Sequence, residues 1–418
     1  MKPFVYILLL AALLLASTAC GSENGNSGGG GGDGGKELPG ALDPANVVKS
    51  NPMKLYAHYM PWFETPATSA DKKWGQHWTM ATCNPDQKDA NGRRQIASHY
   101  YPLIGPYASS DATVLNYHLL PMKYSGIDGI MIDWYGTQDK YDYAPNRRNT
   151  EEVVKAAERV GLQFAIVYED QTLSELPDNS SKVVQAIRDM QYLQTNFFGK
   201  VNYVKADSKP LLLVFGPQAI TTPKDWTSVF GNLSVKPTFV VLNNHLHLAN
   251  NASEKNAAGE YLWVNPDPAS YYSKTGDMEL CIGGAMPGFY DYYKQGGWDN
   301  SYTTYDAENG ALFDRQLAAA KSAGLDYLQI STWNDFGEGT TIEPAEEYGY
   351  NYLTKLQQFS GTSYNEHVLK QIYRWYTLKQ QYAGDKGDAA KYLSQVFYYF
   401  IALQPDKAEE LMNELNNL

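Results

Sequence analysis

The clearest chemical signal in the sequence is a pair of carboxylic acids in the segment WNDFGEG, residues 333–339. Asp335 and Glu338 stand three residues apart, just after a short apolar run that reads as a strand. Gly337 and Gly339 permit a tight, left-handed backbone that would turn both side chains into one cavity. Cleavage of a glycosidic bond generally needs two carboxyl groups, one to protonate the leaving oxygen and one to assist attack at the anomeric carbon. The pair therefore predicts glycoside hydrolysis.

Three further acids compete with this pair on spacing alone. Glu343, Glu346 and Glu347 follow it closely in the sequence. A plain acidic surface loop is also an alternative, because paired carboxylates are common in loops. The sequence of this region does not by itself separate the two interpretations.

Histidine and cysteine residues give little support to a metal site. His245 and His247 have a spacing that two metal ligands could use, but no third ligand accompanies them. Cys83 and Cys281 match no metal-ligand spacing, and they either form a disulfide or remain two buried thiols. We therefore expect a site with no metal and no other cofactor.

An alternation of strands and helices must position the acid pair. Near-continuous apolar runs are typical of parallel strands that are covered on both faces. They predict strands at residues 54–63, 129–134, 163–168, 210–215, 238–242, 261–264, 280–283 and 327–331, with helices at 150–161, 181–198 and 312–323 between them. This pattern predicts an α/β fold, a (β/α)8 TIM barrel. An open doubly wound sheet is the second choice, since no Gly-x-Gly-x-x-Gly turn follows the first strand.

Polar and aromatic residues gather where the expected strands end, which is where a TIM barrel carries its reacting groups. Carboxylates, amides and indoles in these positions would form a polar cup with aromatic walls, suited to sugar rings and their hydroxyls. Trp62, Trp134 and Trp333 each close a strand, which favours the wall of the site over the core. The residues expected to bind substrate are Tyr59, Trp62, His77, Trp78, Asp133, Trp134, Tyr135, Tyr168, Glu169, Asn243, Trp333, Asn334 and Glu343.

Several of these residues also have a structural interpretation. His77 and Trp78 would either shape a subsite or cap the core. Asp133 would bind a sugar hydroxyl or, alternatively, accept hydrogen bonds from neighbouring loop amides. Glu169 and Asp170 would be a reserve acid pair or part of a salt-bridged loop.

The composition fits a globular enzyme and argues against one class of partner. The sequence is 43% hydrophobic, has a net charge of −12 and contains no run of Lys or Arg. Nucleic acid is therefore excluded as a partner, because phosphate contacts need clustered basic residues. The 33 Tyr and 9 Trp supply rings that stack on sugars, although core packing uses such rings too. The expected partner is an oligo- or polysaccharide, bound by a monomer.

The first 20 residues have the pattern of an export signal. Lys2 precedes an apolar run over residues 4–16, which is too short to span a bilayer. Cys20 resembles the lipidated cysteine of a bacterial lipoprotein, although Ser17 stands where such signals usually have Leu. Ser17 and Ala19 also satisfy the small-x-small rule for ordinary cleavage, so free secretion is the alternative.

A flexible tether is expected after this signal, over residues 21–45, because residues 21–35 are almost entirely Gly, Ser, Asn and Asp. A tether directly after a cysteine favours lipidation. The expected location is therefore the outer membrane or cell surface of a bacterium, with membrane contact only through the lipid.

The barrel domain is expected to cover residues 46–355, and the pattern then becomes purely helical. Residues 356–418 form a helical extension, with helices expected at residues 366–382, 389–403 and 406–417. Packing against the barrel is favoured over a partner-binding appendage, because no charge run or motif marks these helices.

Five segments, in order, resemble glycoside hydrolase families 71 and 99, the latter typified by endo-α-1,2-mannosidases. They are YMPW (59–62), WGQHW (74–78), HYYPLIGPY (99–107), GIDGIMIDWYG (126–136) and WNDFGEGTTIE (333–343). The resemblance covers roughly residues 54–355. It implies a (β/α)8 barrel, no metal, and cleavage with retention of the anomeric configuration.

The resemblance also implies roles for the acid pair. Glu338 matches the general acid/base, and Asp335 occupies the position of the carboxylate that deprotonates the 2-hydroxyl of the substrate. In family 99 that oxygen closes a 1,2-anhydro sugar, which water then reopens with the two roles reversed.

The sequence departs from the mannosidase pattern at the first acid. That pattern has Glu, an aromatic residue and His before the second Glu, whereas this sequence has Asp335, Phe336 and Gly337. The expected substrate is therefore α-mannan or α-glucan in general. A surface protein that binds glycans without cleaving them is the alternative function, because a carboxylate displaced by about 1 Å can cost about 10²-fold in rate.

Overall fold

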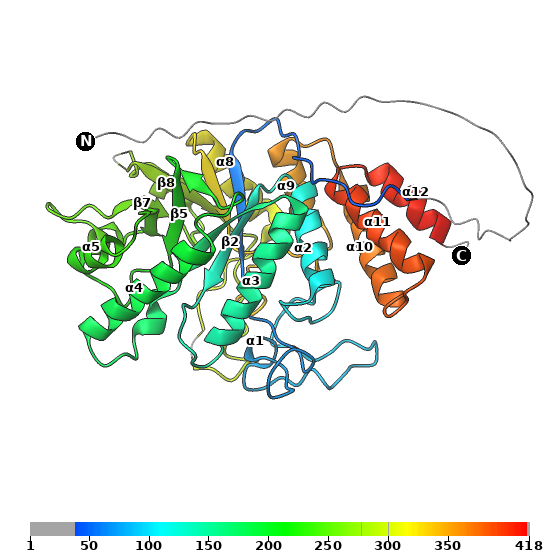
Figure 1. The fold of residues 1–418 in the computed structure, drawn as a ribbon, viewed down its shortest axis with the longest axis horizontal. Helices are drawn as coiled ribbons and strands as arrows, with labels where there is room; N and C mark the ends of the chain where they lie inside the picture. Colours follow the sequence, from blue (N-terminus) through cyan, green and yellow to red (C-terminus); the bar gives the residue numbers. More distant parts are fainter. Residues whose placement is uncertain (1–37, 277, 300, 416–418) are drawn as a thin grey trace, which may run out of the picture. The chain divides into compact units, whose positions relative to one another are not determined.

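The structure is a computed structural model that describes residues 38–276, 278–299 and 301–415. Within them, eight parallel strands form a closed barrel (Figure 1). The strands are β1 (Lys54–Tyr59), β2 (Gly129–Trp134), β3 (Gln163–Tyr168), β5 (Lys209–Val214), β6 (Thr238–Leu242), β7 (Ala257–Tyr261), β8 (Leu280–Ala285) and β9 (Tyr327–Ile330). They pair in this order, β9 closes onto β1, and β4 (Lys205–Ala206) adds a short antiparallel pair to β5. The prediction of a TIM barrel is confirmed.

Seven of the predicted strands coincide closely with observed ones, and one is displaced. β7 (Ala257–Tyr261) ends where the sequence predicts the strand to begin, at residue 261. Its sequence, AAGEY, has no apolar run, so the pattern of a buried strand is missing. Gly259 is required in this strand, because a Cβ atom there would lie 1.8 Å from the carbonyl oxygen of Leu280 on β8.

Side chains along each strand alternate between the barrel interior and the surrounding helices, as in any β-strand. The interior is a separate apolar cluster that includes Met131, Val167, Leu213, Val240 and Ile282. The outward-facing residues of the same strands belong to the larger core beneath the helices. Neighbouring residues at a strand end therefore face opposite ways, which decides which of them reach the site.

Helices cover the outside of the barrel. They include α2 (Ala112–Tyr124), α3 (Tyr143–Val160), α4 (Asn179–Asn196), α5 (Pro223–Gly231), α8 (Ala311–Ser322) and α9 (Asn351–Ser360). α3 begins seven residues before the predicted start at residue 150, and it ends at Gly161, which has a left-handed conformation (φ 79°) as a helix-terminating glycine should. No helix in the described part of the chain combines the length and apolar character needed to cross a membrane.

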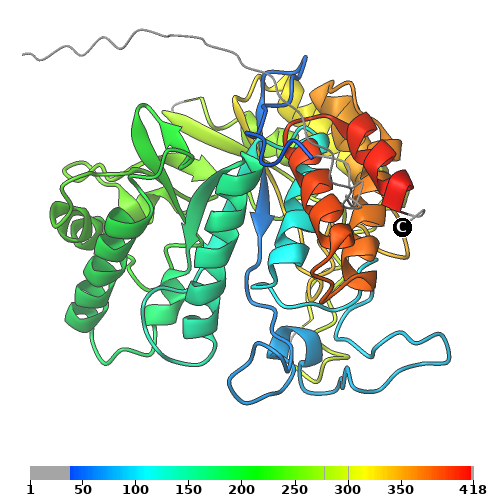
Figure 2. The same ribbon diagram turned by 45° about the vertical axis from the view of Figure 1, so that its right-hand side comes forward.

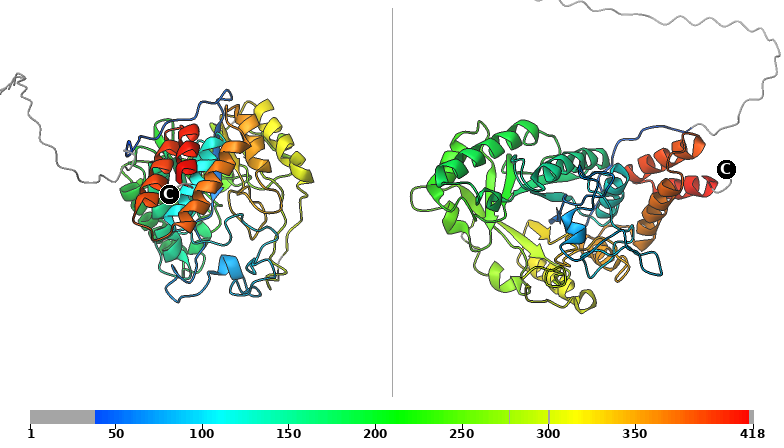
Figure 3. Two further views of the ribbon diagram at one scale, coloured as in Figure 1. Left: turned by 90° about the vertical axis from the view of Figure 1, so that its right-hand side faces the viewer. Right: turned by 90° about the horizontal axis from the view of Figure 1, so that it is seen from below.

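Three C-terminal helices pack together on one flank of the barrel (Figures 2 and 3). They are α10 (Glu366–Gln381), α11 (Asp388–Ile401) and α12 (Pro405–Leu415), and each begins within one residue of its predicted start. α10 lies against α2, where the rings of Tyr117 and Tyr376 are 5.0 Å apart. The hydroxyl of Tyr124 on α2 donates to the carbonyl of Phe400 on α11 (2.9 Å). The described part of the extension is thus joined to the barrel by buried contacts.

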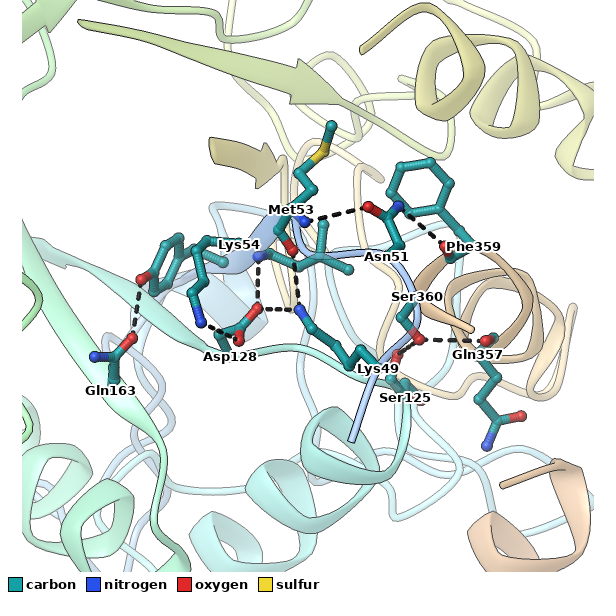
Figure 4. A network of polar contacts seen from close by, with 12 residues as sticks. Lys49, Asn51, Met53, Lys54, Ser125, Asp128, Gln163, Gln357, Phe359 and Ser360 are labelled. Atoms are coloured by element: carbon teal, nitrogen blue, oxygen red, sulfur yellow. Dashed lines mark hydrogen bonds and ion pairs between the residues drawn. The ribbon is translucent and has the colours of Figure 1, made fainter. Parts of the chain in front are cut away.

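Residues 38–53 form a strap across the end of the barrel where the strands begin (Figure 1). The ammonium group of Lys49 contacts the carboxylate of Asp128 and donates to the carbonyl of Met53 at 2.9 Å (Figure 4). The backbone of Asn51 donates to the carbonyl of Ser360 at the end of α9 (3.0 Å). The strap therefore joins the barrel to the C-terminal helices.

The strap changes one predicted boundary. The backbone of Ala45 donates to the carbonyl of Ile401 (2.9 Å), and Gly40 donates to the side chain of Gln395 (2.8 Å). Residues 38–45, expected to belong to the tether, are therefore held against α11. The predicted signal peptide, Cys20 and the rest of the tether lie outside the described residues.

Candidate active site

The predicted acid pair lies on the loop after β9, at the end of the barrel opposite the strap. The backbone N–H of Asp335 donates to Thr332 Oγ1 (2.7 Å), and Asp335 Oδ1 accepts from the N–H of Glu338 (2.9 Å). Gly339 has a left-handed conformation (φ 66°), and a Cβ atom there would lie 2.5 Å from the carbonyl oxygen of Tyr290. The left-handed turn expected of the two glycines is thus found at Gly339, and these contacts fix the loop that carries both acids.

Glu338 opens into a cavity of about 380 Å³. The cavity is lined by Phe215 after β5, Trp263 and Val264 after β7, and Phe289, Tyr302, Thr303 and Tyr305 from the loop after β8. The hydroxyl of Tyr293 donates to Glu338 Oε1 (3.0 Å), whereas Glu338 Oε2 is buried without a hydrogen-bond partner. One oxygen of the acid is thus held in place, while the other makes no hydrogen bond within the protein.

Two more carboxyl groups belong to the same site. Asp133 and Glu169 follow the interior positions Met131 and Val167 at intervals of two, so they point into the end of the barrel. Burial and then the charge of Asp335 raise the pKa of Asp133 well above its usual range. Burial raises the pKa of Glu169 likewise, with further contributions from Asp133, Asp170 and Glu338. Burial thus disfavours the charged form of each of these carboxyl groups.

The environment separates the pKa values of the two candidate catalytic acids. Burial raises the pKa of Asp335 to about 6, and the hydrogen bond from the N–H of Glu338 and the charge of His77 act against this rise. Burial and the nearby charge of Asp335 raise the pKa of Glu338 to about 8. Two acids whose environments push their pKa values apart can serve as base and acid at one pH. At neutral pH these shifts favour the ionised form of Asp335 and the protonated form of Glu338.

An aromatic wall stands beside Asp335. The ring of His77 stacks on Trp62 with centroids 4.0 Å apart and planes at 4°. Tyr135 lies next to Trp62 (6.4 Å), and burial, with contributions from the nearby Asp133 and Asp335, raises the pKa of its hydroxyl. His77 Nε2 is 3.0 Å from Asp142 Oδ2, which fixes its ring. The structure thus brings Trp62, His77 and Tyr135 together with the carboxyl groups.

Five of the aromatic residues predicted to bind substrate are instead fully buried outside the cavity. Trp134 stacks on Tyr192 of α4 (5.7 Å, 15°), and Tyr168 donates to Asp189 of the same helix (2.6 Å). The indole of Trp78 donates to the carbonyl of Tyr107 (2.8 Å) within the core, which agrees with the capping alternative. The remaining two, Tyr59 and Trp333, also belong to the core beneath the helices. Trp134 on β2 and Tyr168 on β3 are buried because side chains alternate along a strand, and at these two positions they point toward the helices.

Glu343 and Asn334 lie in a buried polar network behind the loop. Glu343 Oε2 accepts from the hydroxyl of Tyr107 (2.7 Å), and Glu343 Oε1 lies 3.3 Å from His118 Nε2. Asn334 bonds both the N–H and the carbonyl of Met60 (2.8 and 3.0 Å). Both residues, predicted to bind substrate, are fully buried. Asn334 joins the loop after β9 to the end of β1, and Glu343 joins it to Tyr107 and to His118 of α2.

Asn243 holds a neighbouring part of the wall. Its side-chain oxygen accepts from the N–H of Trp263 (3.3 Å), and its carbonyl contacts His245 Nδ1 (2.9 Å). In the part of the chain that the structure describes, no group of three His, Cys, Asp or Glu residues is arranged to hold a metal ion. Cys83 and Cys281 are separate thiols, each half-buried.

Sequence reasoning missed Phe215, Trp263 and Tyr293. Phe215 and Trp263 stand edge to face with centroids 5.1 Å apart, at the ends of β5 and β7. Phe215 could have been found from alternation, because it follows the interior residues Leu211 and Leu213. Tyr293 lies in an irregular loop, and no period or motif marks it.

Two protein-family models match parts of this chain. Residues 52–255 match the model of glycosyl hydrolase family 99, and residues 224–381 match a domain of unknown function, DUF5010. A glycoprotein endo-alpha-1,2-mannosidase-like protein of Danio rerio is 23% identical over 322 residues, which are 70% of this chain and 71% of that protein. The glycoprotein endo-alpha-1,2-mannosidase of Mus musculus is 23% identical over 340 residues, 74% of this chain and 72% of the relative.

Solved structures show the same fold. The GH99 endo-alpha-mannosidase from Bacteroides thetaiotaomicron superimposes with a TM-score of 0.57 at 20% identity, over 73% of this chain and 95% of that one. A protein described as glycoside hydrolase-like gives a TM-score of 0.52 at 14% identity, over 78% and 97% of the two chains.

Proposed function

Because this chain is related to glycosyl hydrolase family 99, we propose that it is a glycoside hydrolase that cleaves α-linked glycans of the mannan or glucan type. The observation that carries the proposal is the pair of Asp335 and Glu338 on one loop, with pKa values of about 6 and about 8. The direct test is release of oligosaccharides from α-mannan or α-glucan by the purified protein. Binding of these glycans without release would favour a glycan-binding protein instead.

The proposed mechanism uses the two acids in turn. Ionised Asp335 takes the proton of the substrate 2-hydroxyl, and the oxygen attacks the anomeric carbon to close a 1,2-anhydro sugar. Glu338 gives its proton to the departing glycosidic oxygen as that bond breaks. Glu338, now ionised, then takes a proton from water, which opens the three-membered ring, and Asp335 returns its proton to the 2-oxygen. Two inversions at one carbon give overall retention.

The neighbouring groups would support this reaction without exchanging protons. Asp133 and Glu169, whose charged forms are disfavoured by burial, are suited to hydrogen-bond sugar hydroxyls. The Tyr293 hydroxyl fixes Glu338 Oε1, which leaves Oε2 to carry the transferred proton. Trp62 and Trp263 would stack on sugar faces.

The rate should depend on pH with two limbs. Below a pH of about 6 Asp335 is protonated and cannot accept the 2-hydroxyl proton. Above a pH of about 8 Glu338 is ionised and has no proton to donate. We therefore expect a bell-shaped profile of kcat/KM with its maximum between these values, measured as initial rates of reducing-end release from α-mannan. A rate that stays constant from acidic to alkaline pH would contradict these roles.

We further propose that the protein is exported and anchored through a lipid on Cys20, at the outer membrane or cell surface of a bacterium. The support is the apolar run before Cys20 and the glycine-rich segment after it. In a bacterial host grown with labelled palmitate, the full chain should carry the label and sediment with membranes, whereas Cys20→Ala should do neither. Cys83→Ala is the matched control and should keep the label. Unlabelled wild-type protein in the soluble fraction would favour ordinary secretion.

A further inference from the structure

The loop between β8 and α8 exposes an unusual amount of aromatic surface. Tyr290, Trp298 and Tyr302 are 43%, 44% and 58% exposed. Among the described residues, Tyr141 is the only other aromatic residue in the group of exposed large apolar side chains. Single exposed apolar residues are ordinary, but three in one loop need a physical reason.

These rings are held in place rather than left loose. Trp298 stacks on Tyr293 with centroids 4.9 Å apart and planes at 16°, and its N–H donates to the carbonyl of Tyr293 (2.9 Å). Tyr290 stacks on His99 (3.6 Å, 2°). The N–H of Tyr302 donates to the buried carboxylate of Asp291 (2.8 Å). Ordered rings bind a ligand with little loss of conformational entropy.

The same rings are continuous with the catalytic cavity. Tyr302 lines the cavity and is also more than half exposed, so it stands at the mouth. The N–H of Tyr290 donates to the carbonyl of Glu338 (3.0 Å), which joins the two loops. Tyr293 contacts both Glu338 (3.0 Å) and, through its ring, Trp298. A glycan chain that extends out of the cavity past Tyr302 would therefore pass over exposed rings.

We propose that Tyr290, Trp298 and Tyr302 form a platform of outer subsites, which begins with Tyr302 at the mouth of the catalytic cavity and binds sugar residues beyond those inside it. The ligand is a neutral glycan chain, because the platform presents ring faces and phenolic hydroxyls, the combination that suits sugar rings. The cavity of about 380 Å³ is near the lower end of the range for ligand pockets, so a longer chain must extend beyond it. The choice of an α-linked chain rests on the proposed function.

The test measures binding separately from cleavage. The full chain with Glu338→Gln is titrated by calorimetry with α-mannan oligosaccharides, and in parallel with α-glucan oligosaccharides, from disaccharide to hexasaccharide. For either the α-mannan or the α-glucan oligosaccharides, we expect the affinity of the Glu338→Gln protein to rise with the length of the oligosaccharide. Trp298→Ala and Tyr302→Ala, each added to this background, should weaken hexasaccharide binding about tenfold, as loss of a central aromatic contact typically does.

Two matched variants serve as controls. Trp298→Phe keeps a ring and should retain most of the affinity of the Glu338→Gln parent, which separates stacking from a general disturbance of the loop. Tyr141→Ala removes a ring that is more exposed (68%), whose hydroxyl donates to Glu175 (2.8 Å) and whose face is covered by Lys140, so it should have no effect.

The platform and the proposed function can fail separately. Equal hexasaccharide affinity in the parent, Trp298→Ala and Tyr302→Ala would overturn the platform even if the wild type cleaves glycans. Affinity independent of chain length in both series would overturn it too, as would a change of oligomeric state in Trp298→Ala, which would identify the rings as a self-association surface. Length-dependent binding that Trp298→Ala weakens, in a wild type that cleaves nothing, would support the platform and refute hydrolysis.

Discussion

Replacement of Glu338 by Gln is expected to slow glycan cleavage by about 10²–10⁴-fold, the usual contribution of a general acid/base. Gln has the shape of Glu and can still accept the hydrogen bond from the Tyr293 hydroxyl, but it has no proton to give to the leaving oxygen. The measurement is kcat on α-mannan or α-glucan, together with the unfolding temperature. The unfolding temperature should not fall, because the substitution removes a carboxyl group that burial already disfavours in its charged form.

Glu346→Gln is the matched control for this substitution. Glu346 follows the acid pair in the sequence, but its side chain is 42% exposed and paired with Arg93 (3.3 Å). We expect its replacement to leave the rate unchanged. If Glu338→Gln retains full activity while Glu346→Gln loses it, the assignment of the acid/base is wrong.

Replacement of Asp335 by Asn should cause a loss of similar size, about 10²–10⁴-fold. Asn keeps the oxygen that accepts from the N–H of Glu338, so the loop should keep its shape. It cannot take the proton of the 2-hydroxyl. The experiment compares kcat/KM for the wild type, Asp335→Asn and Asp335→Glu on one substrate.

The residual activity of Asp335→Asn provides a second readout. The charge of Asp335 helps to raise the pKa of Glu338, so without that charge the pKa of Glu338 should fall. The alkaline limb of the pH profile should move to lower pH, which a merely structural role of Asp335 would not cause. Asp335→Glu keeps the charge and should leave this limb in place, whatever its rate. An unmoved limb in Asp335→Asn would refute the electrostatic coupling of the pair.

Much of the fold could be predicted because it follows from local regularities. Apolar runs of four to six residues located seven of the barrel strands, and glycine at residue 161 marked the end of α3. β7 was displaced because its sequence is small and polar, and its place is set by contact with β6 and β8. The start of α3 was missed, although its N-cap residue is Asp142, whose carboxylate bonds Gln76 and His77 and makes no capping hydrogen bond.

The site was less predictable because it depends on the direction in which each side chain points as well as on its position in the sequence. Trp134 and Asp133 are neighbours at the end of β2, yet one packs under α4 and the other faces the barrel interior. Period-two alternation would have separated them. Glu343 could not have been placed this way, because its buried position depends on Tyr107 and His118, which are more than 200 residues away in sequence. The role of Tyr293 likewise depends on how one irregular loop meets another.

The strap of residues 38–53 has a consequence for how the enzyme would meet a large polymer. It meets the barrel at the end where the strands begin (Figure 1), whereas the acid pair follows the C-terminal end of β9. Any attachment of the chain before the strap would hold the protein by the end of the barrel where the strands begin. The end that carries the acid pair would then face away from the attachment. A glycan too large to fit between the protein and the surface to which it is attached could then bind from the solvent side. A force on the bound glycan would then pass through the barrel to the strap, which lies at the opposite end from the loop that carries Asp335 and Glu338.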